Sequence, residues 1–292
     1  MGDNKHPICC VPNCGAEGVH GFEVRQRGGI SKAYVCEHHK ELNEAYSADN
    51  LHFIGEPKAN GDTFSYELEL SDCSFSGRVE LAVNHFLPTN DNTVFVEMKS
   101  PIYNGLNGLS KYLKSVEDLM KSGNISNAET WQYWCGTHLH TGNRGFKRNG
   151  LDIPAINADT MDYVRRYYHS LFVPLCQVME QYPEVVKKLF GRDFGTWARK
   201  IDGSTDSMEH RNFINVQHDT TLEWRLSFFV NAEQYQKLAH FCRDAMHDIQ
   251  TMFLYTALQN EGDTPNEKQA RKSAAQKTGA ALAKLFERYI TD

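Results

Sequence analysis

The sequence predicts an α+β protein with an antiparallel sheet. Residues 63–70 and 220–229 alternate between apolar and polar side chains, as expected for strands with one face in the core. Residues 158–175, 183–190 and 232–258 carry apolar side chains at the spacing of amphipathic helices. Clean alternation favours an antiparallel sheet, because a parallel sheet is buried on both faces.

The composition allows a sizeable core: of 292 residues, 40% are apolar and 23% are charged. The net charge of −6 and the isoelectric point of about 6.1 do not indicate nucleic acid or an anionic membrane surface as a partner. No apolar run approaches the roughly 20 residues that span a bilayer, and no apolar segment at the N-terminus resembles a secretory signal. We therefore expect a cytoplasmic protein.

Residues 1–48 predict a small zinc-ribbon-like module, because cysteines and histidines stand there in two close pairs. The candidate zinc ligands are Cys9, Cys14, Cys36 and His39. Four such ligands, in the pattern Cys-x4-Cys and Cys-x2-His, suit tetrahedral Zn²⁺ in a structural site. Cys10 can replace Cys9 in the pattern, and His38 can replace His39. A leader that binds no metal is the alternative interpretation.

After this module we expect a linker at 49–61, a main domain at 62–258 and a helical tail at 259–292. The linker contains Pro57 and several glycine and asparagine residues. A polar break that contains Pro265 precedes the tail, which is rich in alanine and lysine.

The strand at 63–70 places Glu67 and Glu69 on one face and its apolar side chains on the other. Like charges on one strand face repel, so one interpretation is a solvated edge. A divalent cation would reverse this repulsion and is the other interpretation. We expect a second strand at 76–87 and a third at 94–98, where Glu97 stands among apolar residues and needs a partner if it is buried. A helix follows Gly108.

The strand at 134–142 carries His138 and His140, which leave the same face because they are two residues apart. Such a pair is either incidental or presents nitrogen atoms to a metal, a phosphate or a substrate. Residues 143–158 predict a loop. The helix that starts at Ala158 contains Pro174, which is expected to bend it.

Two further regions supply arginines. Arg192 and Arg199 flank a glycine turn, where an anion site is one interpretation and a solvated surface is the other. In the strand at 220–229, Glu223 and Arg225 share one face while Leu222, Trp224 and Leu226 share the other. If these strands form one sheet, their polar faces provide carboxylates, imidazoles and a guanidinium, a set that suits Mg²⁺ and the phosphates of ATP.

Four segments, 64–70, 96–101, 135–142 and 215–228, resemble in order the motifs of the amidoligases. These are carboxylate–amine ligases of the glutamine synthetase and γ-glutamylcysteine synthetase superfamily. The motifs are a Glu-x-Glu strand, a Glu followed by Ser-Pro, a Cys-Gly-x-His-x-His-x-Gly strand, and an Asn and a His before a Glu-Phe-Arg strand. The resemblance covers about residues 62–255. It departs at Trp224, where Phe is usual, and at Asn92-Thr93, where Asp-Gly-Ser is frequent.

The resemblance implies an ATP- and Mg²⁺-dependent ligase that joins a small-molecule or peptide carboxylate to an amine through an acyl phosphate. It also implies a glutamine-synthetase-like sheet, curved into a funnel with helices outside. The Mg²⁺ ligands that it implies are Glu67, Glu69, Glu97 and Glu223. His138 and His140 would add a ligand or a phosphate contact. The implied nucleotide-binding residues are Arg225, Arg211, Glu67 and Asn215. Arg192 and Arg199 would contact substrate.

Two other functions fit the same residues. A zinc-dependent hydrolase would use His138, His140 and a carboxylate as ligands and keep one position open for water. A binding protein on a ligase scaffold would have no catalytic activity, with the zinc module recognising a macromolecule.

Overall fold

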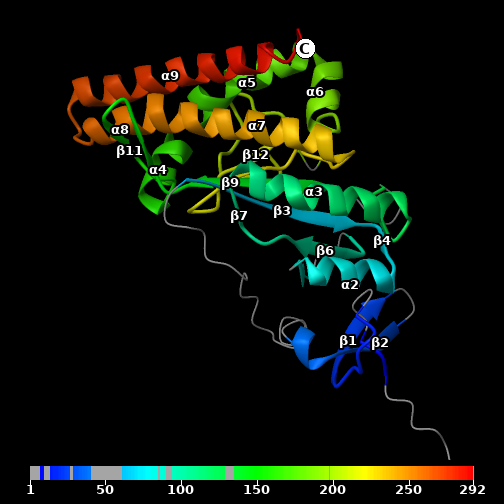
Figure 1. Ribbon diagram of the computed structural model, residues 1–292. Coiled ribbons are helices and arrows are strands. Elements are labelled where there is room, and N and C mark those ends of the chain that lie inside the picture. Colours follow the sequence, from blue (N-terminus) through cyan, green and yellow to red (C-terminus); the bar gives the residue numbers. More distant parts are fainter. Residues whose placement is uncertain are drawn as a thin grey trace, which may run out of the picture. The chain divides into compact units, whose positions relative to one another are not determined.

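The computed structural model describes residues 7–9, 14–26, 29–40, 61–84, 86–89, 94–128, 135–196 and 198–291. Within them the chain is a mixed α+β protein with a mostly antiparallel sheet that is not closed (Figure 1). Its contacts define two compact units. Unit 1 holds residues 1–56, 66–102 and 114–136, and unit 2 holds residues 57–65, 103–113 and 137–292. The predicted linker at 49–61 lies outside the described residues, apart from Gly61.

The N-terminal part of unit 1 is a hairpin followed by a single helical turn. Strand β1 (His20–Gln26) pairs antiparallel with β2 (Gly29–Val35) along its whole length. The 3₁₀ turn η1 (Glu37–His39) follows Cys36 directly. Val35, Cys36 and Cys9 are buried, so the described core of this part lies near the cysteines.

The remainder of unit 1 contains part of the main sheet. Strand β3 (Asp62–Leu70) pairs antiparallel with β6 (Val96–Lys99), and β6 pairs antiparallel with β5 (Leu87–Thr89). A two-stranded ladder of β4 (Asp72–Cys73) and β8 (Ile125–Ser126) lies in the same unit. Tyr66, Leu68 and Leu70 are buried, which confirms the predicted strand at 63–70 and its apolar face. The strand predicted at 94–98 is present as β6, but it begins only at Val96.

The predicted strand at 76–87 is wrong, because residues Phe75–Val83 form helix α2. The hydroxyl of Ser74 accepts a hydrogen bond from the backbone N–H of Gly77 at 3.0 Å, which caps the first turn. Gly77 also lets the helix lie against residues Asn124 and Ile125, since a Cβ at this position would collide with both. The alternation of apolar residues fits a strand, but this cap and this close approach fit only the helix.

Unit 2 contains the strands of the histidine motif. Strand β9 (Thr137–Asn143) pairs antiparallel with β13 (Leu222–Trp224), which pairs antiparallel with β12 (Ile214–Asn215). β7 (Tyr103–Asn104) pairs with the first residues of β3. The strand predicted at 220–229 is much shorter than expected. The chain turns after Trp224, where the hydroxyl of Ser227 donates to the Trp224 carbonyl at 2.7 Å.

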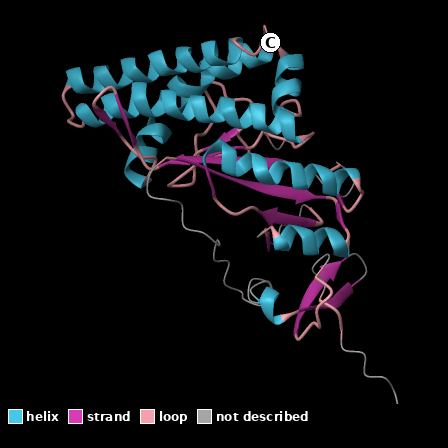
Figure 2. Cartoon of the chain, in the orientation of Figure 1, coloured by secondary structure: helices cyan, strands magenta, loops and turns pink. Residues whose placement is uncertain are grey.

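The loop predicted at 143–158 contains a hairpin of β10 (Phe146–Arg148) and β11 (Leu151–Ile153) (Figure 2). The two strands are joined by Asn149 and Gly150, both of which have positive φ angles, of 51° and 81°. Asn-Gly is the residue pair that a tight two-residue hairpin turn favours. The signal was therefore in the sequence.

Helices make up most of the rest of unit 2. In chain order they are α4 (Ala158–Arg166), α5 (Tyr168–Gln181), α6 (Pro183–Phe190), α7 (Ala232–Asp248), the π-helical η2 (Ile249–Leu254), α8 (Tyr255–Gln259) and α9 (Pro265–Glu287). The prediction at 183–190 is confirmed in full. The helix predicted from Ala158 breaks at Tyr167, whereas Pro174 lies inside α5. The helix expected after Gly108 is α3 (Gly105–Lys121).

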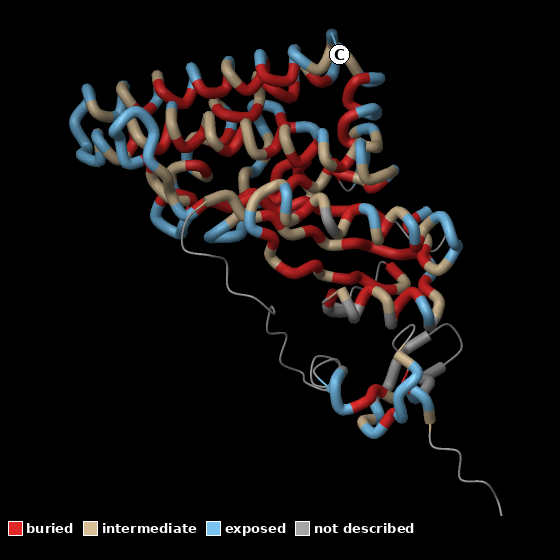
Figure 3. Tube along the Cα trace, viewed as in Figure 1, coloured by how far each residue is buried: buried red, intermediate tan, exposed pale blue. Residues whose placement is uncertain are grey.

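Helices α5, α7 and α9 pack side by side, and their facing sides are buried while their outer sides are exposed (Figures 1 and 3). Gly279 lets α9 lie close against α5, because a Cβ there would collide with the carbonyl oxygen of Ser170 on α5. Within the described part of the chain, no helix combines the length and the apolar character that crossing a membrane requires.

Candidate functional site

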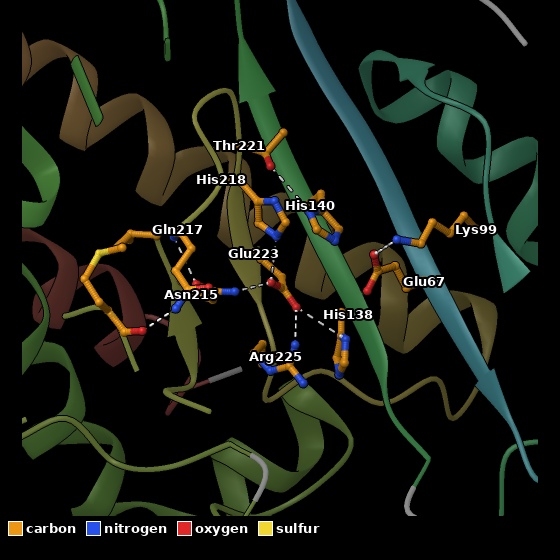
Figure 4. Close-up of polar contacts among 12 residues, drawn as sticks. Glu67, Lys99, His138, His140, Asn215, Gln217, His218, Thr221, Glu223 and Arg225 are labelled. Atoms are coloured by element: carbon orange, nitrogen blue, oxygen red, sulfur yellow. Dashed lines mark hydrogen bonds and ion pairs between the residues drawn. The ribbon is translucent and has the colours of Figure 1, made fainter. Parts of the chain in front are cut away.

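Three neighbouring strands of unit 2 carry one row of polar residues. In the register of the sheet, Asn215 on β12 lies opposite Glu223 on β13, and Glu223 lies opposite His140 on β9. Cross-strand partners point to the same face of a sheet. Figure 4 shows the three side chains on this face, with Glu223 in the middle.

The opposite face of the same strands is apolar and faces the helices. Trp224, Leu139 and Ile214 are fully buried. The Trp224 ring contacts Phe241 on α7 edge to face, with centroids 5.8 Å apart, and its indole N–H donates to Thr141 Oγ1 at 3.0 Å. The alternation of the sequence thus puts the hydrophobic side chains in the core and leaves the charged row on the other face.

Glu223 is the centre of the cluster. Its side chain is only 2% exposed, and both of its oxygens have partners (Figure 4). Oε1 lies 2.6 Å from Arg225 Nη1 and 3.4 Å from His138 Nδ1. Oε2 accepts a hydrogen bond from Asn215 Nδ2 at 2.6 Å and lies 3.1 Å from His218 Nε2. An ionised carboxylate accepts through both oxygens, as this one does.

Burial alone would raise the pKa of Glu223. The hydrogen bond to His218 and the charges of His138, His140 and Arg225 outweigh burial, so the pKa of Glu223 lies well below its usual range. The carboxylate is therefore ionised at neutral pH. A carboxylate that stays ionised while buried can bind a cation or orient a guanidinium toward an anion.

Two of the imidazoles around this carboxylate, those of His140 and His218, also contact each other. His140 Nδ1 lies 3.3 Å from the hydroxyl of Thr221, and the rings of His140 and His218 meet edge to face with centroids 5.1 Å apart. One ligand atom from each of His140, His218 and Glu223 lies within 4.8 Å of the other two. The group can therefore hold a metal ion.

Unit 1 has a second polar row of its own. In the pairing of β3 with β6, Glu67 lies opposite Lys99 and Glu69 lies opposite Glu97. Lys99 Nζ is 2.8 Å from Glu67 and 3.6 Å from Glu97. Burial would lower the pKa of Lys99, but the two glutamates raise it. The positive partner that the structure shows for these carboxylates is thus a lysine, which the sequence analysis did not single out.

The N-terminal cysteines of unit 1 converge as predicted. The thiol sulfurs of Cys9, Cys14 and Cys36 lie within 4.8 Å of one another, and those of Cys14 and Cys36 are 3.7 Å apart. Cys10 and the side chain of His39 lie outside the described residues, so the fourth position of the predicted zinc site is not described.

Three predicted arginines are not partners of Glu223. Arg211 lies 3.7 Å from Glu209, and its backbone carbonyl accepts a hydrogen bond from Arg199. Arg199 is exposed, and Arg192 directly follows Gly191, the C-cap of α6. Asn92 and Thr93, where the sequence departs from the amidoligase motif, lie outside the described residues.

Sequence reasoning missed His218 as a site residue. The signal was present, because His218 belongs to the motif of an Asn and a His before the Glu-Trp-Arg strand. Its side chain is 46% exposed, yet it reaches the buried Glu223 from the loop between β12 and β13.

The chain was compared with protein-family models, with curated proteins and with solved structures, and none of them matches it.

Proposed function

We propose that the chain is an ATP- and Mg²⁺-dependent carboxylate–amine ligase of the amidoligase type. The observation that carries this proposal is the row of unit 2, where a buried, ionised Glu223 is bound by Arg225 and surrounded by imidazoles. Phosphoryl transfer depends mainly on positioning and on neutralising charge, and these are the groups it needs. The four ordered sequence motifs support the same reaction.

In the proposed reaction, a carboxylate oxygen of the acid substrate attacks the γ-phosphorus of ATP, and ADP leaves. The acyl phosphate that results is attacked by the amine, and inorganic phosphate leaves as the amide forms. Arg225 is assigned to the phosphoryl group because its guanidinium is a planar donor of several hydrogen bonds. Arg211 is assigned as a helper, and the substrate contacts proposed for Arg192 and Arg199 rest on the resemblance.

The carboxylates proposed as Mg²⁺ ligands are Glu67, Glu69, Glu97 and Glu223. Their oxygens have the chemistry that Mg²⁺ prefers, and Glu69 and Glu97 are buried opposite each other in unit 1. The ion would neutralise charge on the ATP phosphates. The funnel-shaped sheet of the glutamine synthetase type is part of the same proposal.

Turnover of ATP tests the proposal directly. The purified chain is incubated with ATP, Mg²⁺ and pools of carboxylic acids and amines, and ADP and amide products are measured by mass spectrometry. We expect ADP release that needs both an acid and Mg²⁺, and an amide that needs the amine as well. A chain that neither binds nor turns over ATP with any pool would overturn the ligase and favour the binding protein.

A metal-dependent hydrolase is the second candidate, and the grouping of His140, His218 and Glu223 favours it. The hydrolase predicted from the sequence would use His138 and His140 as ligands, whereas this grouping contains His218 in place of His138. The two candidates separate by their need for nucleotide. A hydrolase cleaves its substrate by adding water and requires no ATP, whereas the ligase forms no amide without it.

We further propose that Cys9, Cys14 and Cys36 bind one structural Zn²⁺. Three cysteine sulfurs at this separation form a strong ligand set for Zn²⁺, which binds cysteine in its thiolate form. Cys36→Ser is expected to lower the zinc content, measured by mass spectrometry of metals, by about one equivalent per chain. Cys73→Ser, which replaces a buried single cysteine of the same unit, serves as the control and retains it. Equal zinc in both variants would contradict the assignment.

A further inference from the structure

Unit 2 contains a set of candidate metal ligands that suits a transition metal better than Mg²⁺. His140, His218 and Glu223 offer two imidazole nitrogens and one carboxylate oxygen within 4.8 Å of one another. Mg²⁺ prefers oxygen ligands throughout, whereas imidazole suits zinc, cobalt, nickel and other first-row transition metals. His218 Nε2 and Glu223 Oε2 are 3.1 Å apart, close to the separation of two neighbouring ligands of one ion at about 2.1 Å each.

Two of the three ligands are fixed by the sheet. His140 and Glu223 are opposite each other in the pairing of β9 with β13, and both are buried. The hydroxyl of Thr221 lies 3.3 Å from His140 Nδ1, which leaves Nε2 as the ring's candidate ligand atom. A partner on the other ring nitrogen is the usual way in which proteins orient a metal-binding histidine.

The third ligand stands on a loop, and Arg165 on α4 holds that loop. Arg165 Nε donates to the carbonyl of Val216 at 2.9 Å, and Nη2 donates to the carbonyl of Gln217 at 3.0 Å. Nη2 also lies 2.7 Å from the Asp219 carboxylate and 3.4 Å from the carbonyl of His218 itself. One guanidinium therefore contacts four successive residues of the loop.

The start of the loop is tied to Glu223 through Asn215. Asn215 Oδ1 accepts the backbone N–H of Gln217 at 3.0 Å, while its amide nitrogen donates to Glu223 at 2.6 Å. The half-exposed imidazole of His218 is thus kept beside Glu223 by its backbone. Holding an exposed loop this tightly costs conformational entropy, which is reasonable if the position of the imidazole matters.

We propose that His140, His218 and Glu223 form a binding site for a divalent transition metal, with Arg165 as the residue that positions His218. The charge of the cluster defines what else binds. Glu223 contributes one negative charge and Arg225 one positive charge. A divalent ion then leaves an excess of two positive charges, which an anionic ligand such as a polyphosphate balances. In this respect the inference rests on the proposed function and adds the class of metal that accompanies the nucleotide.

Cobalt(II) is the probe that tests this site, because its visible spectrum reports its ligands. Co²⁺ is added to the full chain, which keeps the zinc with which it was purified, and absorption and calorimetry follow binding. We expect one equivalent of Co²⁺ whose spectrum shows d–d bands without thiolate-to-metal charge transfer. A tenfold excess of Mg²⁺ is not expected to displace the bound Co²⁺. A non-hydrolysable ATP analogue is expected to increase the affinity for Co²⁺.

Two variants and a control test His218 as a ligand and Arg165 as the residue that positions it. His218→Ala is expected to weaken Co²⁺ binding by on the order of 100-fold, and Arg165→Gln by about 10- to 100-fold, as for residues that orient a ligand. His210→Ala, which removes an exposed imidazole that precedes β12, is the matched control and leaves Co²⁺ binding unchanged. Circular dichroism confirms that each variant is folded.

The outcomes separate this inference from the ligase. If no Co²⁺ binds, or if it binds as well to His218→Ala as to the control, the metal site is overturned even if ATP is turned over. If His218→Ala loses Co²⁺ while no ATP turnover is found, the metal site stands and the ligase falls. If Arg165→Gln binds Co²⁺ normally and only melts earlier, Arg165 has a structural role and its positioning role is overturned.

Discussion

Glu223→Gln is expected to lower the proposed ATP turnover strongly and to lower the free energy of unfolding by about 3 kcal/mol, because it removes the charge at the centre of a buried network. Glu223 contacts Arg225, Asn215, His218 and His138, and the glutamine amide cannot accept from all of them. We expect turnover to fall by at least about 100-fold, in line with the loss of one preorganised charge from a phosphoryl-transfer site. Urea denaturation and ADP release measure the two effects.

The loss of stability is expected to depend on pH in one direction. The pKa of Glu223 is lowered in the folded chain and lies near 4.3 in the unfolded chain. The stabilisation from its charge is therefore complete above about pH 5 and declines as the pH falls below the unfolded value. The difference in unfolding free energy between wild type and Glu223→Gln should therefore shrink as the pH falls from about 5 to about 3.

Glu233→Gln is the matched control for this experiment. Glu233 is an exposed residue of α7 whose partner is Lys237 one turn away, and such surface pairs contribute little. Its replacement should leave both turnover and the urea midpoint close to those of the wild type. If Glu223→Gln behaved like this control, the carboxylate would not be the centre of a functional site.

The parts of the fold that could be predicted are those that side-chain periodicity determines. The alternation in 63–70 gave β3 and its buried face, and the helical spacing in 183–190 gave α6 to the residue. The same alternation gave the correct faces around Glu223, since Trp224 packs on Phe241 of α7 while Glu223 lies in the row with Asn215 and His140. Burial of one face is a local property of the chain, so one sequence suffices to predict it.

The errors occurred where a local contact or a single pair of residues decided the structure. The apolar alternation in 76–87 fits a strand, and only the cap at Ser74 and the packing at Gly77 select α2. The turn at Asn149 and Gly150 makes a hairpin of an apparently polar loop. In both cases two residues outweigh the composition of the segment around them.

The candidate site was predicted only in part, for a different reason. Glu223 and His140 could be placed on polar faces, but their being opposite each other follows from the register of β9 and β13. Arg165 reaches a carbonyl 51 residues further along the chain. Lys99 faces Glu67 only because β3 and β6 pair as they do. Register and long-range contacts depend on the whole fold, so residue spacing does not contain them.

The second large effect is expected at Trp224, which separates the core from the polar row. Trp224→Ala is expected to lower the free energy of unfolding by about 3–5 kcal/mol, the usual cost of deleting a buried large aromatic side chain. The ring is fully buried and packs on Phe241, so its loss opens a cavity between β13 and α7. Because Trp224 lies between Glu223 and Arg225, ATP turnover should fall with it.

Trp224→Phe distinguishes packing from chemistry at this position. Phenylalanine keeps the aromatic contact with Phe241 but cannot donate to Thr141 Oγ1 in the protein interior. The expected loss is about 1–2 kcal/mol, from one buried hydrogen bond and a smaller ring. Thr141→Val should cost a similar amount, because it leaves the indole N–H of Trp224 without its acceptor, and the double variant should cost less than the sum. If turnover survives in Trp224→Phe and fails in Trp224→Ala, residue 224 supports the polar row by packing. The wild type and Trp224→Phe would then share an aromatic ring at this position but not the indole N–H.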